Sequence, residues 1–499
     1  MALFRVHCKK MPFTGHRPRC HVRRDPMRHF RSLAACILAL TLTLSLAVPA
    51  SAASGSFTDV PAGHWAAAEI RRSVQVGLIQ GETATRFGLG RSMTRGAFAS
   101  ILCRFFQWEL VDYQDFFPDV PKDLWCCQAI ETALVHGTVT TQADNFRPGD
   151  PITREEMAVM LVRALGYGSI SGLDLGLSCP FTDVRTNQGY LALAYHLGIV
   201  NGTSATTFSP DRSATREQAV VMLMRIYDRY YSAAPAKLGF VCDAARKENW
   251  TGFTDLILSG GRLSASGVVT APKGVDDFLV QCRLQGSQAI LGVTADAAAL
   301  SGDPTLQASR VVSAADGFGG VALTVSGMTA KQRDNLTALA TALRQLLPSQ
   351  RLLVSVDANG SYDLAALAAQ CDGLLLSTTP APVTKNGIRV APLEPPEEII
   401  RALASVPASA RNKLSLTLST AADGCTEADV AALAAKNRSY YSDRYAQNYL
   451  LANGAAVWYH DAASVAERIQ LCRLFGIGSV CLSDLSALAP DSSILKGIR

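Results

Sequence analysis

The first half of this 499-residue chain repeats one pattern three times. The tetrapeptide F-x-D-V is followed roughly 35 residues later by a Thr-Arg pair, a spacing typical of repeat proteins. The Thr-Arg pairs are Thr94-Arg95, Thr153-Arg154 and Thr215-Arg216. A repeated supersecondary unit cannot bury its apolar face alone and must stack on its neighbours. The pattern therefore predicts one module of three stacked units, over 57–106, 117–165 and 181–228.

Each Thr-Arg pair is predicted to begin a helix. Thr153 with Glu156, and Thr215 with Gln218, form capping boxes, in which side chain and backbone satisfy each other's donors. Apolar residues then recur at helical spacing. The arginine lies in the first turn, where the helix dipole favours negative charge. An arginine repeated in this place suits an anionic ligand. The alternatives are that the arginine forms a surface salt bridge or that the aliphatic part of its side chain packs on neighbouring residues.

These units resemble S-layer homology domains, the modules by which many bacterial surface proteins hold non-covalently to cell-wall polysaccharide. The resemblance covers Phe57 to Tyr227 and includes an aromatic residue after F-x-D-V, a glycine that ends the first helix, and a loop before Thr-Arg with F-x-P or, at Phe87-Gly88, a relic of it. It implies an α-helical, three-unit bundle that binds a secondary cell-wall polysaccharide, pyruvylated in the family. The residues expected to bind this polymer are Arg95, Arg154, Arg216, Asp59, Asp119, Asp183, Trp65 and Trp125.

The three copies are unequal. The first lacks an acid after Thr-Arg, where it has Gly96 and Ala97, and the third has Gly189 in the tryptophan position. Trp65 and Trp125 have a second interpretation, as core anchors.

The N-terminus indicates export. The apolar run Leu33–Val48 follows several arginines and precedes Ala-Ser-Ala, the layout of a secretory signal peptide over 1–52, with Met27 as an alternative start. These residues carry nine of the 47 basic and one of the 42 acidic residues, so the remaining chain has a net charge of −3. We expect a protein secreted to the bacterial cell wall, not integral to the membrane once processed, and no nucleic-acid partner. Its ten remaining cysteines, mostly single and in apolar runs, indicate structural thiols, with no metal and no cofactor.

After a linker at 229–236, short apolar strands alternate with amphipathic helices over 237–499, which predicts an α/β fold, a (β/α)8 TIM barrel. Segments such as GFGGVALTVSGMTAKQRDNL and VWYHDAASVAERIQLCRLFGIGSVCLSDL resemble glycoside hydrolase family 18, which includes chitinases. That family carries D-x-x-D-x-D-x-E on its fourth strand, and the glutamate is the general acid. The corresponding residues here are Gly319, Ala322, Thr324 and Ser326. Protonating a glycosidic oxygen requires a carboxyl group with a raised pKa, so we expect that the catalytic motif is lost.

The favoured hypothesis is wall anchoring that displays a non-catalytic barrel, with a binding or structural role toward amino-sugar polymers. Candidate sugar contacts are Trp250, Trp458 and Tyr459. One alternative is an active cell-wall or spore-cortex hydrolase that uses non-standard acids. Asp243 and Asp484 are the pair left open for it, because they end neighbouring strands, although both also suit strand-end caps. A second alternative is a structural S-layer protein.

Overall fold

The computed structural model describes residues 57–140, 144–173, 175–245, 250–385, 388–421, 425–452, 455–489 and 491–498. The predicted signal segment 1–52 and the alternative start at Met27 lie outside the described residues.

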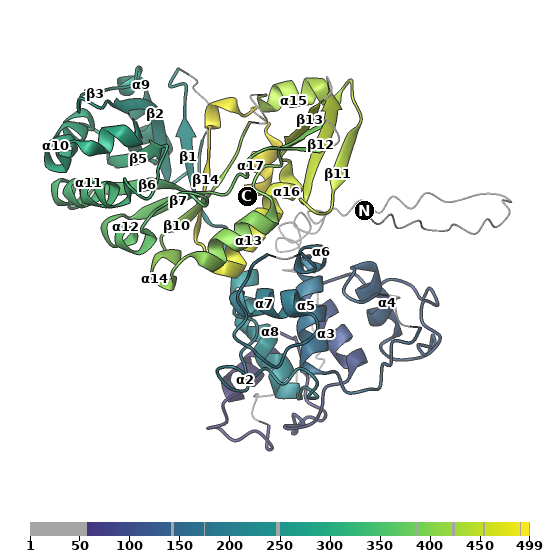
Figure 1. Cartoon of the computed structure of the whole chain (residues 1–499). Helices are drawn as coiled ribbons and strands as arrows, with labels where there is room; N and C mark the ends of the chain where they lie inside the picture. The colour runs from purple at the N-terminus through teal and green to yellow at the C-terminus, as the bar shows by residue number, and fades with distance from the viewer. Residues whose placement is uncertain are drawn as a thin grey trace, which may run out of the picture. The chain divides into compact units, whose positions relative to one another are not determined.

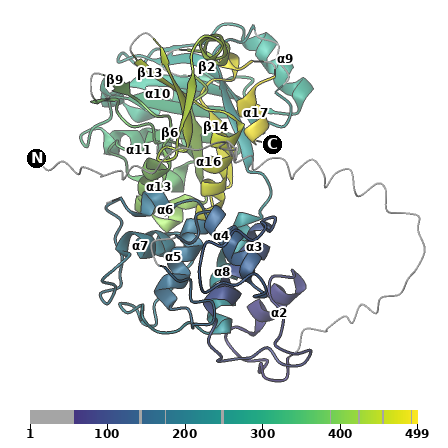
Figure 2. The ribbon, with the colours of Figure 1, turned by 90° about the vertical axis from the view of Figure 1, so that its right-hand side faces the viewer.

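The three repeats form a helical bundle, shown from two directions in Figures 1 and 2. The first helices of the repeats are α2 (Ala67–Gln75), α4 (Cys127–Val135) and α7 (Gln188–His196). The second helices are α3 (Arg95–Phe106), α5 (Arg154–Ala164) and α8 (Arg216–Tyr230), and a short helix α6 (Gly168–Ser171) lies between the second and third repeats. Helix α3 packs against α4, α5 against α7, and α8 against α2. The bundle is therefore closed, because the third repeat returns to the first.

The second helices begin where the sequence predicts. At Thr153 the capping box is complete, since its hydroxyl accepts from the Glu156 N–H and the Glu156 side chain accepts from the Thr153 N–H. At Thr215 the Gln218 side chain accepts the backbone N–H at a longer 3.2 Å. These caps satisfy donors that a helix start leaves without intrahelical partners.

Three backbone segments meet at the centre of the bundle, immediately before the Thr-Arg pairs. The Met93 N–H donates to the Ala214 carbonyl, Ala214 donates to Ile152, and Ile152 donates to Met93, each at 2.9 Å. All three residues have 0% exposed surface. The centre is therefore a cyclic set of hydrogen bonds that requires all three repeats.

The second half is a barrel of parallel strands, with helices such as α10, α11 and α12 outside it (Figure 1). The strands, in order around the barrel, are β1 (Ala236–Val241), β2 (Asp255–Leu263), β4 (Gln288–Asp296), β5 (Gly320–Ser326), β6 (Arg351–Asp357), β7 (Gly373–Ser377), β10 (Leu414–Leu418) and β14 (Ser479–Leu482). Strand β1 pairs with both β14 and β2, which closes the ring. The predicted (β/α)8 barrel is confirmed.

The helices of the barrel are α9 (Val275–Gln285), α10 (Pro304–Ala314), α11 (Arg333–Leu346), α12 (Leu364–Gln370), α13 (Pro396–Ser405), α14 (Ala408–Arg411), α16 (Ala462–Phe475) and α17 (Ser493–Ile498), with the 3-10 turns η1 (Ala297–Ser301) and η2 (Leu485–Ala487). Strand β3 (Val269–Thr270) pairs antiparallel with β2. Apolar side chains fill the barrel, as in other barrels of this class. They belong to Leu238, Ile257, Ile290, Ala322, Leu353, Leu375 and Cys481.

Two small sheets were not predicted. The hairpin β8 (Val383–Lys385) and β9 (Ile388–Val390) follows β7. An insert between β10 and α16 contains α15 (Glu427–Ala434) and an antiparallel sheet of β11 (Ser439–Ser442), β12 (Gln447–Ala452) and β13 (Ala455–Tyr459).

The cysteines of the described residues carry free thiols, and most are buried. Burial raises the pKa of Cys103, Cys282 and Cys472 to about 12. These thiols are therefore protonated at neutral pH and behave as small apolar side chains.

Candidate functional site

The fourth barrel strand, β5, contains Ala322, Thr324 and Ser326, three of the residues that the sequence analysis aligned with the acids of family 18. Ala322 is fully buried inside the barrel, and residues 322, 324 and 326 share the inward face because side chains alternate along a strand. The Thr324 and Ser355 hydroxyl oxygens lie 2.8 Å apart. The Ser326 hydroxyl donates to Asp296 Oδ1 at 3.0 Å. Gly319 lies one residue before the strand, so this strand presents no carboxyl group.

The two carboxylates of the hydrolase alternative bind backbone N–H groups. Asp484 Oδ1 accepts from the N–H groups of Ser486 at 2.8 Å and Cys242 at 3.3 Å. Asp243 Oδ1 accepts from the Ala245 N–H at 3.0 Å. Both therefore act as a cap or turn acceptor at the end of a strand.

The candidate sugar contacts of the barrel are largely covered. Trp250 is 3% and Trp458 is 5% exposed. The Trp458 ring stacks on Tyr449 of the neighbouring strand, with the centroids 4.7 Å apart. Tyr459 is half-buried and packs against the small apolar core of the insert. Neither tryptophan presents a ring face to solvent.

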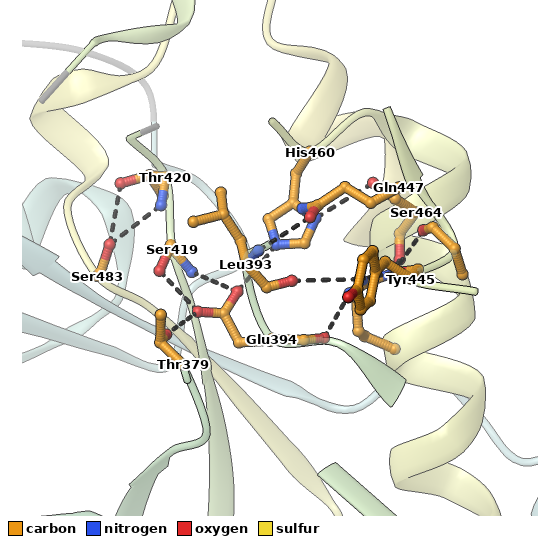
Figure 3. A network of polar contacts seen from close by, with 12 residues as sticks. Thr379, Leu393, Glu394, Ser419, Thr420, Tyr445, Gln447, His460, Ser464 and Ser483 are labelled. Carbon is orange, nitrogen blue, oxygen red and sulfur yellow. Dashed lines mark hydrogen bonds and ion pairs between the residues drawn. The ribbon is translucent and has the colours of Figure 1, made fainter. Parts of the chain in front are cut away.

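A buried polar network, missed by the sequence analysis, joins the insert to the barrel (Figure 3). Glu394 Oε1 accepts from the hydroxyls of Thr379 and Ser419 at 2.6 Å each, beyond the C-terminal ends of β7 and β10. Its Oε2 accepts from the Ser419 N–H and lies 2.9 Å from His460 Nε2. Burial alone would raise the pKa of Glu394. The hydrogen bonds from His460, Ser419 and Thr379 have the larger combined effect, so the pKa is lowered overall.

The tautomer of His460 follows from Gln447. The Gln447 Oε1 accepts from the Leu393 N–H at 2.9 Å, so its amide nitrogen faces His460 Nδ1 at 3.1 Å. Nδ1 is then an acceptor, and Nε2 carries the proton that is donated to Glu394. Burial lowers the pKa of His460, which keeps the ring neutral. The carboxylate and the ring are both buried and hydrogen-bonded, so the pair connects the insert to the strand ends of the barrel.

Arg468 completes the network. Its five N–H donors reach five backbone carbonyls, those of Glu394, Ala446, Ser464, Leu393 and Tyr445. The side chain is 0% exposed. The Glu394 carboxylate interacts electrostatically with this buried cation, and opposite charges lower the cost of burying each other.

In the helical module, each predicted arginine contacts the phenylalanine loop of another repeat, which is F-x-P at Phe146 and Phe208 and Phe87-Gly88 in the first repeat. The Nε–H groups donate to backbone carbonyls at 2.7, 2.9 and 3.0 Å in the pairs Arg95–Phe146, Arg154–Phe208 and Arg216–Phe87. Each guanidinium also lies over the ring of the same phenylalanine, at 4.9, 4.5 and 5.0 Å. We name these contacts junction 1 (Arg95), junction 2 (Arg154) and junction 3 (Arg216).

Toward the described residues, each guanidinium group uses two of its five N–H donors. The second partners are Glu156 for Arg95, the Asn201 carbonyl for Arg154 and the Gln80 carbonyl for Arg216. Burial lowers the pKa of all three side chains, yet arginine stays charged in proteins. The junctions therefore hold largely buried cations that have spare donors.

The aspartates of F-x-D-V bind backbone N–H groups of the same loops. Asp59 accepts from the N–H groups of Phe87, Gly88 and Leu89 at 2.7–3.1 Å. Asp119 and Asp183 make equivalent contacts in their own repeats, with Phe146 and Arg147 and with Phe208 and Ser209. Burial alone would raise the pKa of Asp59 and of Asp183. The hydrogen bonds from these N–H groups have the larger combined effect, so both pKa values are lowered overall. The aspartates therefore stabilise the conformation of the loop in their own repeat.

The tryptophans lie on the surface. Trp65 is 59% and Trp125 is 69% exposed, so neither is a core anchor. Trp65 precedes α2, which packs against α8, the helix of Arg216. Trp125 precedes α4, which packs against α3, the helix of Arg95. At Gly189 an added Cβ would lie 2.1 Å from the Ser171 carbonyl oxygen of α6. The third repeat therefore has no room for a tryptophan in that position.

A family model described as "S-layer homology domain" matches residues 56–99, 116–158 and 180–220. The chain carries three S-layer homology domains. Among curated proteins it is similar to an endoglucanase of Bacillus sp. (strain KSM-635), 28% identical over 46% of this chain and 25% of that protein. It is also similar to an S-layer protein of Bacillus licheniformis, 30% identical over 46% of this chain and 26% of that protein. The chain spans only a tenth to about a quarter of the length of such relatives.

Among solved structures, the chain is similar to a chitinase from Chromobacterium violaceum (19% identity, TM-score 0.46, covering 53% of this chain and 99% of that one). A second is the Bacillus cereus spore cortex-lytic enzyme SleL (14% identity, TM-score 0.43, covering 53% and 73%). The barrel assignment itself rests on the strand pairing described above.

The S-layer homology domains indicate a bacterial cell-surface protein. In the part of the chain that the structure describes, no helix has the length and apolar character needed to cross a membrane. Nor do the described residues bring together three or more side chains of the kinds that bind metals.

Proposed function

We propose that the three S-layer homology domains anchor this protein non-covalently to an acidic cell-wall polysaccharide, such as a pyruvylated polymer. The observation that carries the proposal is the largely buried arginine with spare N–H donors at each junction. A guanidinium fork matches a carboxylate in shape and charge. The exposed rings of Trp65 and Trp125, at the helices that form junctions 3 and 1, are suited to stack on a sugar ring.

We further propose that the barrel is displayed without hydrolytic activity and has a binding or structural role toward amino-sugar polymers. Support comes from strand β5, where the residues in the acid positions are an alanine in the core and two hydroxyl side chains. Asp243 and Asp484 are engaged as turn and cap acceptors. Family 18 chemistry requires a carboxylic acid beside the scissile bond.

Co-sedimentation of the full protein with purified wall polysaccharide tests the anchoring. One sample of polymer keeps its pyruvyl groups and a second has lost them. Replacing Arg154 and Arg216 with Ala should abolish retention on the first sample, whereas Arg104→Ala, an exposed position on α3, serves as the control. Retention that survives the double substitution in a folded protein would refute the arginine assignment.

Incubation with chitooligosaccharides and peptidoglycan fragments tests the barrel. We expect no turnover. Turnover that is lost in Asp484→Asn would establish the hydrolase alternative in place of the non-catalytic barrel.

A further inference from the structure

The three junctions differ in the charge of the third residue of each second helix. At junction 1 this residue is Glu156, whose Oε1 accepts from Arg95 Nη1 at 2.6 Å. The same oxygen also accepts from Arg147 Nη2 at 3.0 Å. The corresponding residues are Gln218 at junction 2 and Ala97 at junction 3. Among the residues that the structure describes, a carboxylate contacts the arginine at junction 1 and at neither of the other two.

At junctions 2 and 3 the guanidinium groups meet neutral partners. Arg154 is 7% exposed, and its hydrogen bonds go to the carbonyls of Phe208 and Asn201. Among the described residues, no carboxylate lies within 4.0 Å of Arg154 or of Arg216. Arg212 and Arg225 add positive charge around Arg154, and Asp183 adds negative charge. Arg216 has Glu82 as its main negative neighbour, although no ion pair joins these two described residues. An almost fully buried cation without a carboxylate partner is costly unless a ligand neutralises it.

We propose that Glu156 is an internal counterion that prevents an acidic sugar from binding at junction 1, so that junctions 2 and 3 take the acidic groups of the polymer. A ligand carboxylate at Arg95 must displace Glu156 or lie beside it, and two carboxylates that share one site repel each other. This inference rests on the proposed anchoring function, and it specifies which of the three junctions can bind an acidic sugar.

The capping box allows the charge to be tested separately from the fold. Glu156 Oε2 accepts from the Thr153 N–H at 2.9 Å, and Gln218 Oε1 performs the same task for Thr215 at 3.2 Å. Glutamine and glutamate both fit the third position of a capping box. Glu156→Gln and Gln218→Glu therefore exchange the charge between junctions 1 and 2 and keep the cap.

The experiment is calorimetric titration of the full chain with a methyl hexoside that carries a pyruvyl ketal, and with its methyl ester as the uncharged control. Glu156→Gln should raise the stoichiometry by one ligand per chain. Gln218→Glu should lower it by one, and Ala97→Glu, which places the carboxylate at junction 3, should lower it as well. Thermal unfolding of each variant verifies the fold.

The outcomes separate the two proposals. If the wild type binds the acid but Glu156→Gln and Gln218→Glu leave its stoichiometry unchanged, the counterion role is overturned. If neither the wild type nor any variant binds the acid in preference to the ester, the anchoring proposal itself fails.

Discussion

Arg216 in the third repeat covers the ring of Phe87 in the first, 129 residues earlier in the chain. The guanidinium lies 5.0 Å from the ring centroid, and Nε donates to the Phe87 carbonyl at 3.0 Å. This contact joins the last repeat to the first, as equivalent contacts join the other neighbours. The same arginines therefore hold the module together and supply the proposed ligand site, and experiments must measure both properties.

The first prediction concerns stability. Arg216→Ala removes two hydrogen bonds and a cation–π contact, so it should lower the free energy of unfolding by about 1–3 kcal/mol. Urea denaturation of the full protein measures this change, with Arg104→Ala as the exposed control on α3. A shift no larger than that of the control would contradict the bridging role.

The second prediction concerns acid stability of the helical module. Asp59 and Asp183 have lowered pKa values in the folded state. Their contribution is therefore complete above the unfolded pKa of about 3.9 and is lost as the pH falls through the lower, folded values. The measurement is thermal unfolding at settings from about pH 6 to about pH 3. On acidification, the unfolding temperature should decrease less in the double variant Asp59→Asn, Asp183→Asn than in the wild type. An unaltered pH profile would show that these carboxylates do not hold the loops.

The third prediction concerns His460. Burial lowers the pKa of His460 in the folded protein. As the pH falls through about 6.5, the histidine becomes protonated in the unfolded chain but stays neutral in the folded one. Stability of the barrel should fall as the pH drops below about 6.5, and this part of the loss should vanish in His460→Gln. The lowered pKa of Glu394 affects stability only at more acidic pH, which separates the two groups. The measurement is the urea midpoint at a series of pH values, and an equal slope in both proteins would oppose the neutral-ring assignment.

The fourth prediction concerns Arg468. Arg468→Met leaves five backbone carbonyls and the Glu394 carboxylate without their cation, and should cost about 3–5 kcal/mol. Arg468→Lys keeps the charge but has only three donors, so it should also be clearly destabilised. Urea unfolding compares the variants. A lysine variant as stable as the wild type would mean that charge alone, without the planar fork, holds this site.

The sequence predicted features that are local or periodic. The three second helices, their caps and the eight-stranded barrel follow from capping residues and apolar spacing. The arginines were recognised because an unfavourable placement recurred. Their contacts could not be predicted, because a capping box describes only its own helix, whereas Glu156 also reaches Arg95 in the preceding repeat.

The barrel shows the same limit at longer range. Trp458 is a candidate sugar contact in the sequence, but it lies in a three-stranded insert that was not predicted, and it stacks there on Tyr449. Glu394 and His460 are 66 residues apart and lie outside regular apolar patterns, so no local signal connects them. Sequence patterns describe elements, whereas these contacts depend on how elements meet.

The cyclic hydrogen bonds of Met93, Ile152 and Ala214 restrict how such an anchor can be inherited. Deleting one repeat would leave a buried N–H group and a buried carbonyl without partners, at a cost of about 1–3 kcal/mol for each group. A gene that gains or loses a single repeat would therefore encode an incomplete module. We expect this anchor to be duplicated, lost or joined to new cargo only as a complete set of three.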